Sequence, residues 1–187
     1  MGNGESKTKN KTETSCILDK LRTETKFSQS ELQTWYDRFH QDFPTGYIER
    51  EDFRYMYSTI SGQQNSDDLA DIIFQAYDSD NNGTIDFREF MTTLSVTCRG
   101  SKEERLNWVF DMYDTDNSGT LSRNEIIHAL NAILKMKGFE DTEHLAAVQT
   151  EDIFKRMDGD GDGIITRKEF LSVATRQPGI CEVFNVK

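Results

Sequence analysis

The sequence is poor in cysteine, and the few cysteines that it has form no recognisable pattern. Cys16, Cys98 and Cys181 are odd in number, far apart and in no C-x-x-C pair. A chain of 187 residues is long enough to bury a core without disulfide bonds. We therefore expect free or structural thiols and a reducing compartment.

Long hydrophobic runs are also missing. No stretch approaches the roughly 18 apolar residues that a membrane span requires, and no apolar signal-peptide segment follows the N-terminus. With 35% hydrophobic and 29% charged residues, the composition fits one or two small globular domains. We expect a cytoplasmic chain.

Basic charge and catalytic motifs are scarce as well. The net charge of −11 disfavours nucleic acid as a partner, because phosphate contacts need clustered lysine and arginine. His40, His128 and His144 form no H-E-x-x-H pattern, and the chain has no P-loop or G-x-S-x-G motif. We predict that the chain binds no nucleic acid and is not an enzyme.

Acidic residues, by contrast, are concentrated in a twelve-residue pattern that occurs three times. Residues 78–89, 114–125 and 158–169 match D-x-[DN]-x-[DN]-G-x₅-E, with Ser118 at the fifth position of the middle segment. The serine hydroxyl can still coordinate a cation. Three matches in one chain are too many for coincidence, so the sequence predicts three EF-hand calcium loops.

The spacing follows from the coordination of calcium, which takes about seven oxygens at roughly 2.3–2.6 Å. Loop positions 1, 3 and 5 supply side chains, position 7 a backbone carbonyl, position 9 a water-mediated contact and position 12 both carboxylate oxygens. The predicted ligands are Asp78, Asp80, Asn82, Thr84 and Glu89; Asp114, Asp116, Ser118, Thr120 and Glu125; and Asp158, Asp160, Asp162, Ile164 and Glu169.

The flanks of the three loops predict the fold. Apolar residues lie one, four and five places before each loop, which is one face of an amphipathic helix. At position 8, Ile85, Leu121 and Ile165 suit the pairing of two loops back to back. We therefore predict an all-α fold of four EF-hands in two paired lobes, with short two-stranded β links between paired loops.

An earlier hand is predicted around Gly46, which takes the place of the glycine at loop position 6. The alignment puts Gln41 at position 1, Phe43 at position 3 and Asp52 at position 12. A phenylalanine cannot ligate, and aspartate is one methylene too short for the bidentate role of glutamate. This first hand should fold as a helix–loop–helix that holds no calcium, which leaves three Ca²⁺ sites.

The helices around that first loop are unusually aromatic. We interpret these residues as too many for one small lobe to bury, and we predict a groove that opens for a protein target. The predicted groove residues are Trp35, Tyr36, Phe39, Phe53, Met56 and Tyr57.

The N-terminus carries a lipidation motif. Residues 1–6 fit M-G-x-x-x-[ST], which predicts N-myristoylation of Gly2 and contact with a membrane surface. One myristoyl chain gives only marginal, reversible membrane binding, which suits a switch. The rest of residues 1–26 is polar, and we expect it to be mobile until it docks.

We expect four segments in the chain. Residues 1–26 form an acylation segment, 27–98 a first EF-hand pair with one active loop, 101–176 a second pair with two active loops, and 177–187 a tail.

Together these features resemble the neuronal calcium sensor family, in its visinin-like, recoverin and neurocalcin group. The resemblance implies an acyl group that calcium extrudes and a membrane-associated target such as a receptor kinase, guanylate cyclase or ion channel. Phe43 departs from the family, which usually has cysteine there, and residues 137–143 and the tail match no member closely. The motifs that carry the resemblance are the Gly2 motif, Lys26-Phe27-Ser28 before Trp35-Tyr36, Phe43-Pro44-Thr45-Gly46, and residues 83–90, 94–97 and 99–100.

The sequence therefore predicts a cytoplasmic calcium sensor that associates reversibly with membranes. An alternative stays open: a cytosolic calcium buffer, or an adaptor that holds calcium constitutively. Either would need neither a lipid motif nor an exposed apolar groove.

Overall fold

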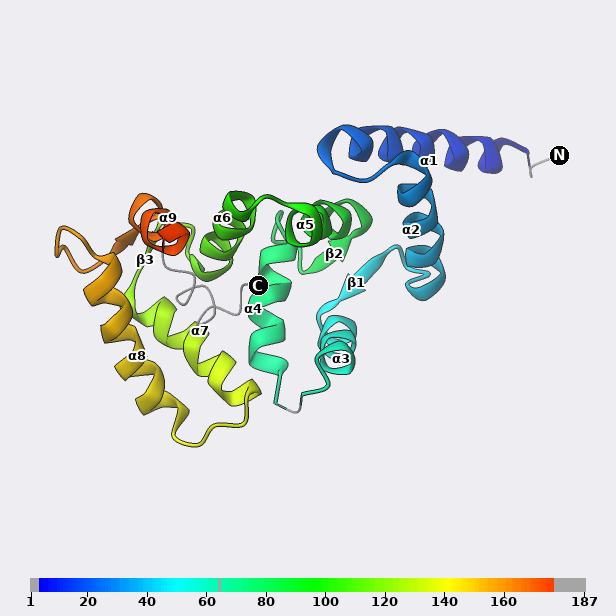
Figure 1. The fold of residues 1–187 in the computed structure, drawn as a ribbon. Coiled ribbons are helices and arrows are strands. Elements are labelled where there is room, and N and C mark those ends of the chain that lie inside the picture. Colours follow the sequence, from blue (N-terminus) through cyan, green and yellow to red (C-terminus); the bar gives the residue numbers. More distant parts are fainter. Residues whose placement is uncertain (1–3, 64, 177–187) are drawn as a thin grey trace.

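The chain folds into helices that are joined two by two through short strands (Figure 1), as the computed structural model describes for residues 4–63 and 65–176, with side chains from Thr14 onward. The first lobe contains α2 (Gln29–Asp42), β1 (Tyr47–Glu49), α3 (Arg50–Ser61), α4 (Asp67–Tyr77), β2 (Thr84–Asp86) and α5 (Phe87–Arg99). The second lobe contains α6 (Lys102–Tyr113), β3 (Thr120–Leu121), α7 (Arg123–Met136), α8 (Thr142–Met157), β4 (Ile165–Thr166) and α9 (Arg167–Arg176).

The two-stranded links form where the sequence places them. β1 and β2 are antiparallel with Ile48 opposite Ile85, and β3 and β4 are antiparallel with Leu121 opposite Ile165. All four of these position-8 side chains are fully buried. The predicted all-α fold with two pairs of hands is confirmed.

A helix that the sequence patterning did not predict precedes the first lobe. α1 (Gly4–Glu24) crosses α2, and its first turns project beyond the lobe (Figure 1). Near its end, Leu18 and Leu21 are buried in the first-lobe core beside Phe27. The Thr14 hydroxyl also donates to the Tyr36 hydroxyl, 3.2 Å away. Two leucines three residues apart give this polar helix one apolar stripe that docks.

The starts of α2 and α6 are held by capping boxes that also tie segments together. The hydroxyl of Ser28 accepts from the backbone N–H of Glu31, and the Glu31 carboxylate accepts from the N–H of Ser28. The same carboxylate pairs with Arg99 at 2.6 Å. At the start of α6, Glu104 pairs in the same way with Lys26 at 2.5 Å. The segment between α1 and α2 is thereby fastened to the junction of the two lobes.

Helix α4 contributes to both hydrophobic cores. Ala70 and Phe74 pack in the first-lobe core, whereas Leu69 and Ile72 pack in the core of the second lobe. All four side chains are buried. The lobes therefore meet along α4, which stands between them in Figure 1.

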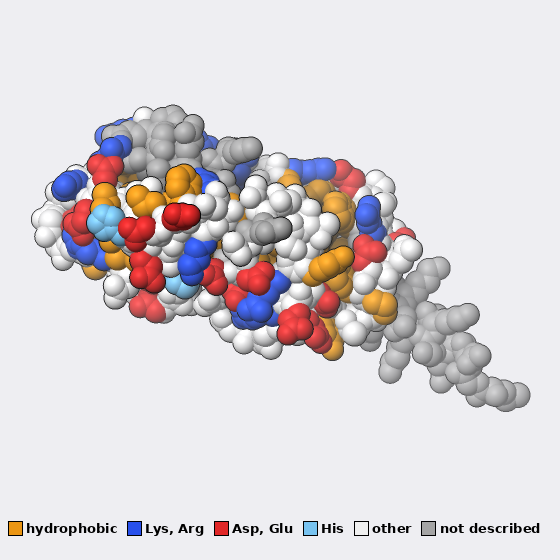
Figure 2. Space-filling model, turned by 90° about the horizontal axis from the view of Figure 1, so that it is seen from below, with side chains coloured by type: hydrophobic (Ala, Val, Ile, Leu, Met, Phe, Trp, Pro, Cys, Tyr) orange, Lys and Arg blue, Asp and Glu red, His pale blue; other side chains and the backbone are white. Residues whose placement is uncertain are grey.

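On the face seen from below, the described side chains form no large apolar area. Figure 2 shows acidic, basic and hydrophobic side chains interspersed there, with the hydrophobic ones in small groups. Within the described ranges, no helix is long and apolar enough to cross a membrane.

Candidate calcium sites

Each of the three acidic loops brings carboxylates together. In every group, one ligand oxygen from each residue lies within 4.8 Å of the others. Oxygens that surround one Ca²⁺ at roughly 2.3–2.6 Å lie no more than about 5 Å apart, so the donor set fits this ion. The groups are Asp78, Asp80 and Glu89; Asp114, Asp116 and Glu125; and Asp158, Asp160 and Asp162.

The aspartate at position 1 is oriented by the backbone of its own loop. In the second hand, Oδ1 of Asp78 accepts from the N–H of Asn82 at 3.0 Å, and Oδ2 accepts from the N–H of Gly83 at 2.9 Å. Asp114 makes the equivalent bonds to the N–H groups of Ser118 and Gly119. Oδ2 of Asp158 likewise accepts from the N–H of Gly163, whereas its Oδ1 accepts from the N–H of Gly161 at position 4. Donors on one side of each carboxylate fix its direction, and Asp78 and Asp114 are buried.

The side chains at positions 3 and 5 form short turns with the residues that follow. Oδ1 of Asp80 accepts from the N–H of Asn82 at 3.0 Å, and Oδ1 of Asn82 accepts from the N–H of Thr84 at 2.9 Å. Such Asx turns hold the predicted ligands in a tight arc. The same bonds form in the third loop, where Asp116 and Ser118 accept and Thr120 is the donor at position 7. They also form in the fourth loop, where Asp160 and Asp162 accept and Ile164 is the donor at position 7.

The closing glutamates reach both ends of their loops. Oε1 of Glu89 accepts from the N–H of Ser79 at 2.9 Å, and Oε2 accepts from the N–H of Asp86 at 3.0 Å. The donors to the other two carboxylates are the N–H groups of Thr115 and Ser122 for Glu125, and of Gly159 and Thr166 for Glu169. The position-2 donor could not be predicted from the sequence, because any residue other than proline supplies a backbone N–H.

Hydrogen bonds favour the ionised form of two candidate ligand carboxylates, Glu169 and Asp116. The Thr166 hydroxyl, with backbone N–H groups, holds the pKa of Glu169 below its usual range. The Ser118 hydroxyl does the same for the pKa of Asp116. Both groups are thus anionic at neutral pH, which is the form that binds a hard cation.

Each closing glutamate lies on the first turn of an outgoing helix, so a force on the carboxylate acts on that helix.

The first loop has the backbone turn of a calcium loop but different side chains at the ligand positions. Gly46 adopts a φ of 87°, close to the 85° of Gly83 in the second loop. Phe43 packs its ring 5.4 Å from that of Phe39, while Gln41 and Asp52 are exposed. The phenylalanine therefore serves the core of the lobe from a position where the other loops have an aspartate.

The predicted groove residues pack within the first-lobe core. Phe39 and Phe53 are 3% exposed, and the rest are half-buried. Trp35 lies 5.9 Å from Phe90, ring to ring. The half-buried members are Trp35, Tyr36, Met56 and Tyr57, which contact the buried residues of that core. The predicted acylation site, Gly2, lies outside the described residues.

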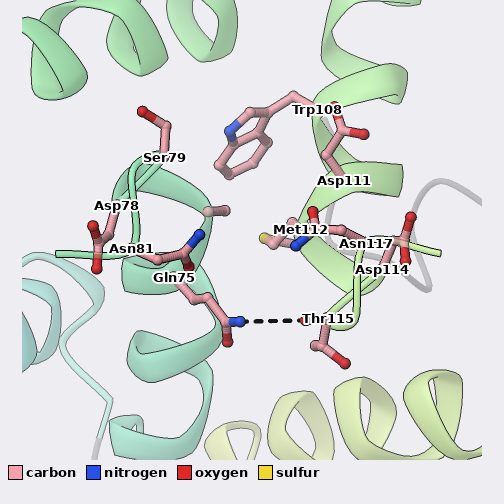
Figure 3. A pocket seen from close by; sticks show the side chains of 11 residues that line it. Gln75, Asp78, Ser79, Asn81, Trp108, Asp111, Met112, Asp114, Thr115 and Asn117 are labelled. Atoms are coloured by element: carbon pink, nitrogen blue, oxygen red, sulfur yellow. Dashed lines mark hydrogen bonds between the residues drawn. The ribbon is translucent and has the colours of Figure 1, made fainter. Parts of the chain in front are cut away.

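A cleft separates the second and third loops. It encloses about 250 Å³ between α4 and α6, and the indole of Trp108 lies within it (Figure 3). Gln75 donates to the carbonyl of Thr115 across it at 3.5 Å. Asp78 and Asp114 lie at its two outer sides in Figure 3. The two loops are therefore neighbours although they belong to different lobes.

The paired helices and acidic loops define a calcium-binding EF-hand protein, and comparisons with known families agree. Residues 44–97 and 103–175 each match an EF-hand domain pair. Recoverin of Homo sapiens is 35% identical over 161 residues, which cover 83% of this chain and 80% of recoverin. S-modulin of Aquarana catesbeiana is 34% identical over 129 residues, which cover 69% of this chain and 64% of S-modulin, less than two thirds of its length. The chain belongs to the neuronal calcium sensor family.

Proposed function

We propose that this protein is a calcium sensor that binds three Ca²⁺ ions and regulates a membrane-associated protein target. The observation that carries the proposal is the position of the closing glutamates Glu89, Glu125 and Glu169, which link each loop to its outgoing helix. In sensor EF-hands, calcium reorients these helices and opens a hydrophobic groove.

The groove that opens is formed by the first-lobe aromatics. These residues pack against one another and against α5, which begins just after β2 of the second loop. A rotation of α5 would separate Phe90 from Trp35 and expose the aromatic faces. A receptor kinase, guanylate cyclase or ion channel then binds there.

The N-terminal helix connects this opening to the membrane. α1 is docked on the first lobe through Leu18, Leu21 and the Thr14–Tyr36 hydrogen bond. Movement of Tyr36 would loosen α1 and, with it, the segment that carries a myristoyl group on Gly2. The protein acts as a regulator and not as an enzyme, in the cytoplasm and reversibly on membranes.

The test is sedimentation with liposomes after co-expression with an N-myristoyltransferase. We expect pelleting with calcium, none with a chelator, and none in Gly2→Ala under either condition. Pelleting with and without calcium would contradict the switch and mean a permanent anchor. No pelleting at all would remove the membrane from the function.

A second candidate function is a calcium buffer or a constitutively loaded adaptor. The close packing of the first-lobe aromatics favours it, because a buffer has no need to open a groove. A hydrophobic dye distinguishes the two. A sensor gains dye fluorescence on calcium addition, and a first-lobe substitution such as Trp35→Ala changes that gain. A buffer binds the same ions with no gain.

A further inference from the structure

An arginine recurs at loop position 10, and in each case it reaches the partner hand of the same lobe. Its guanidinium carbon lies over the ring of the phenylalanine four residues before the partner loop. We call these residues the arginine clamps. The pairs, with the distance from carbon to ring centroid, are Arg50 over Phe74 at 4.6 Å, Arg123 over Phe154 at 4.1 Å and Arg167 over Phe110 at 4.2 Å.

Each clamp also bonds to the residue seven places before the partner loop. Arg50 lies 3.5 Å from Asp71, and Arg123 lies 3.2 Å from Glu151. Arg167 lies 3.5 Å from the Asn107 side chain, which holds the equivalent position. Because the same contacts recur at equivalent positions, the arginine clamps are part of the interface between the two hands of a lobe.

One arginine clamp, Arg123, also bonds to the calcium loop of its partner hand. Nη1 of Arg123 donates to the backbone carbonyl of Gly163 at 3.1 Å, inside the fourth calcium loop. The N–H of Gly163 in turn donates to Oδ2 of Asp158, the position-1 ligand of that loop, also at 3.1 Å. Arg123 itself lies two residues before Glu125, which closes the third loop. The first turn of α7, followed by these two hydrogen bonds, therefore joins the closing residue of one loop to the first ligand of the next.

We propose that Arg123 is a positioning residue that couples calcium binding in the third loop to calcium affinity in the fourth. The proposal rests on calcium binding by both loops. When Glu125 is drawn toward an ion, the first turn of α7 moves and carries the guanidinium with it. The Gly163 carbonyl follows, and through the glycine its N–H moves with the Asp158 carboxylate that this N–H holds. Linkage makes the effect reciprocal, so an ion in the fourth loop favours the third equally.

The chemistry of the guanidinium suits this role. Its planar fork offers several N–H donors and stacks on a ring, which a lysine ammonium cannot do. Arg123 thus contacts Phe154, Glu151 and Gly163 together. The pair with Glu151 is about half exposed on both sides, so that ion pair adds little by itself. The coupling therefore depends on the bond to the Gly163 carbonyl.

The first arm of the test measures calcium affinity in the full chain with the second loop disabled by Glu89→Gln. The affinity of the fourth loop is determined with the third loop intact and with Glu125→Gln, and the ratio is the coupling factor. We expect a factor of about fivefold or more with Arg123, and below about twofold in Arg123→Met. The matched control is Arg50→Met, the clamp of the other lobe, which should leave the factor unchanged.

The second arm uses the metal-free chain and amide hydrogen exchange. Holding the Gly163 carbonyl also fixes the N–H of Ile164, which donates to Asp162 at 3.0 Å. In Arg123→Met we expect the Ile164 amide to exchange about fivefold faster, the factor of one ordinary hydrogen bond. The amide of Thr84, with the same bond in the second loop, should exchange at its original rate.

The outcomes separate the two proposals. An Arg123→Met variant that weakens both loops but keeps the coupling factor would make the clamp merely structural and overturn the inference. Unchanged exchange at Ile164 would overturn it too, whatever calcium does. A wild-type chain that takes up no calcium in either loop would overturn the proposed function on titration alone.

Discussion

At the scale of single residues, one carboxylate in each of the three acidic hands connects the loop to its outgoing helix. Glu89 lies three residues into the turn that begins at Asp86 and accepts hydrogen bonds from both ends of its loop. Glutamate is long enough to do this and still offer two oxygens to an ion. Asp52 of the first hand is shorter and lies exposed.

This gives a prediction for calcium stoichiometry. Glu89→Gln, Glu125→Gln and Glu169→Gln should each lower the number of bound ions by one, because an amide offers a single oxygen and no charge. Isothermal titration calorimetry counts the ions. Asp52→Asn is the control and should leave the count at three. A variant of any closing glutamate that still bound three ions would show that its loop was misassigned.

The candidate ligand residues could be predicted from sequence because calcium demands oxygen donors at fixed intervals along one short segment. The contacts of Arg123 could not, since its partners Phe154 and Gly163 lie in another hand. Only a comparison of position 10 across the hands hints at them. The sequence also predicts that Phe43 is not a ligand, but its packing on Phe39 depends on the folded lobe.

At the scale of elements, the part of α1 whose side chains are described, from Thr14 onward, buries two leucines in the first-lobe core. Leu18 and Leu21 are the buried leucines of an otherwise polar helix. Such a sparse stripe explains why sequence patterning predicted the helices around the loops and not this one. The strong helices have apolar residues on every turn, and α1 has them near its end.

We therefore predict that Leu21→Ala releases α1. The substitution should lower the free energy of unfolding by about 2–5 kcal/mol, the usual cost of removing a fully buried leucine side chain. Limited proteolysis should then cut within α1 faster than in the wild type. Lys20→Ala, an exposed neighbour, is the control and should change neither quantity. Equal cleavage in Leu21→Ala and wild type would mean that other contacts hold the helix.

The capping glutamates give a prediction for pH. The Arg99 side chain lowers the pKa of Glu31 to about 2, and the Lys26 side chain lowers the pKa of Glu104 to about 2, both from 4.5. A pKa depressed in the folded state stabilises it above about pH 4.5, and that stabilisation is lost as the pH falls toward about 2.

The measurement is the unfolding midpoint of the metal-free protein between those two pH values. The double variant Glu31→Gln/Glu104→Gln should show a shallower decline than the wild type. Glu140→Gln, an exposed residue in the α7–α8 connection, should decline like the wild type. A double variant with an unchanged slope would show that these pairs do not contribute to the fold at neutral pH. Their solvent exposure keeps the effect small.

At the scale of the whole molecule, negative charge opposes the folded state. The net charge is −11, and the loops gather carboxylates within 4.8 Å of one another. Each calcium ion cancels two negative charges. Calcium should therefore stabilise the fold twice over, through coordination and through relief of repulsion.

The corresponding prediction concerns salt. In the metal-free protein, the midpoint of thermal unfolding should rise when potassium chloride is added from low ionic strength to about 0.15 M. At that concentration the Debye length is about 8 Å, so the salt weakens the repulsion between the charges of the loops. With calcium bound, the rise should be smaller. Differential scanning calorimetry measures both. An equal rise in the two states would mean that the loop carboxylates are not the source of the repulsion.

Because α4 buries Ala70 and Phe74 in one lobe and Leu69 and Ile72 in the other, the molecule cannot be divided at the boundary that its repeats suggest. A fragment that ended at residue 98 would carry two apolar side chains with nothing to cover them. The isolated second lobe would have a cavity in its core where Leu69 and Ile72 pack in the full chain. Evolution can duplicate hands as units, but once a helix is shared between two cores, the pairs can no longer be exchanged separately.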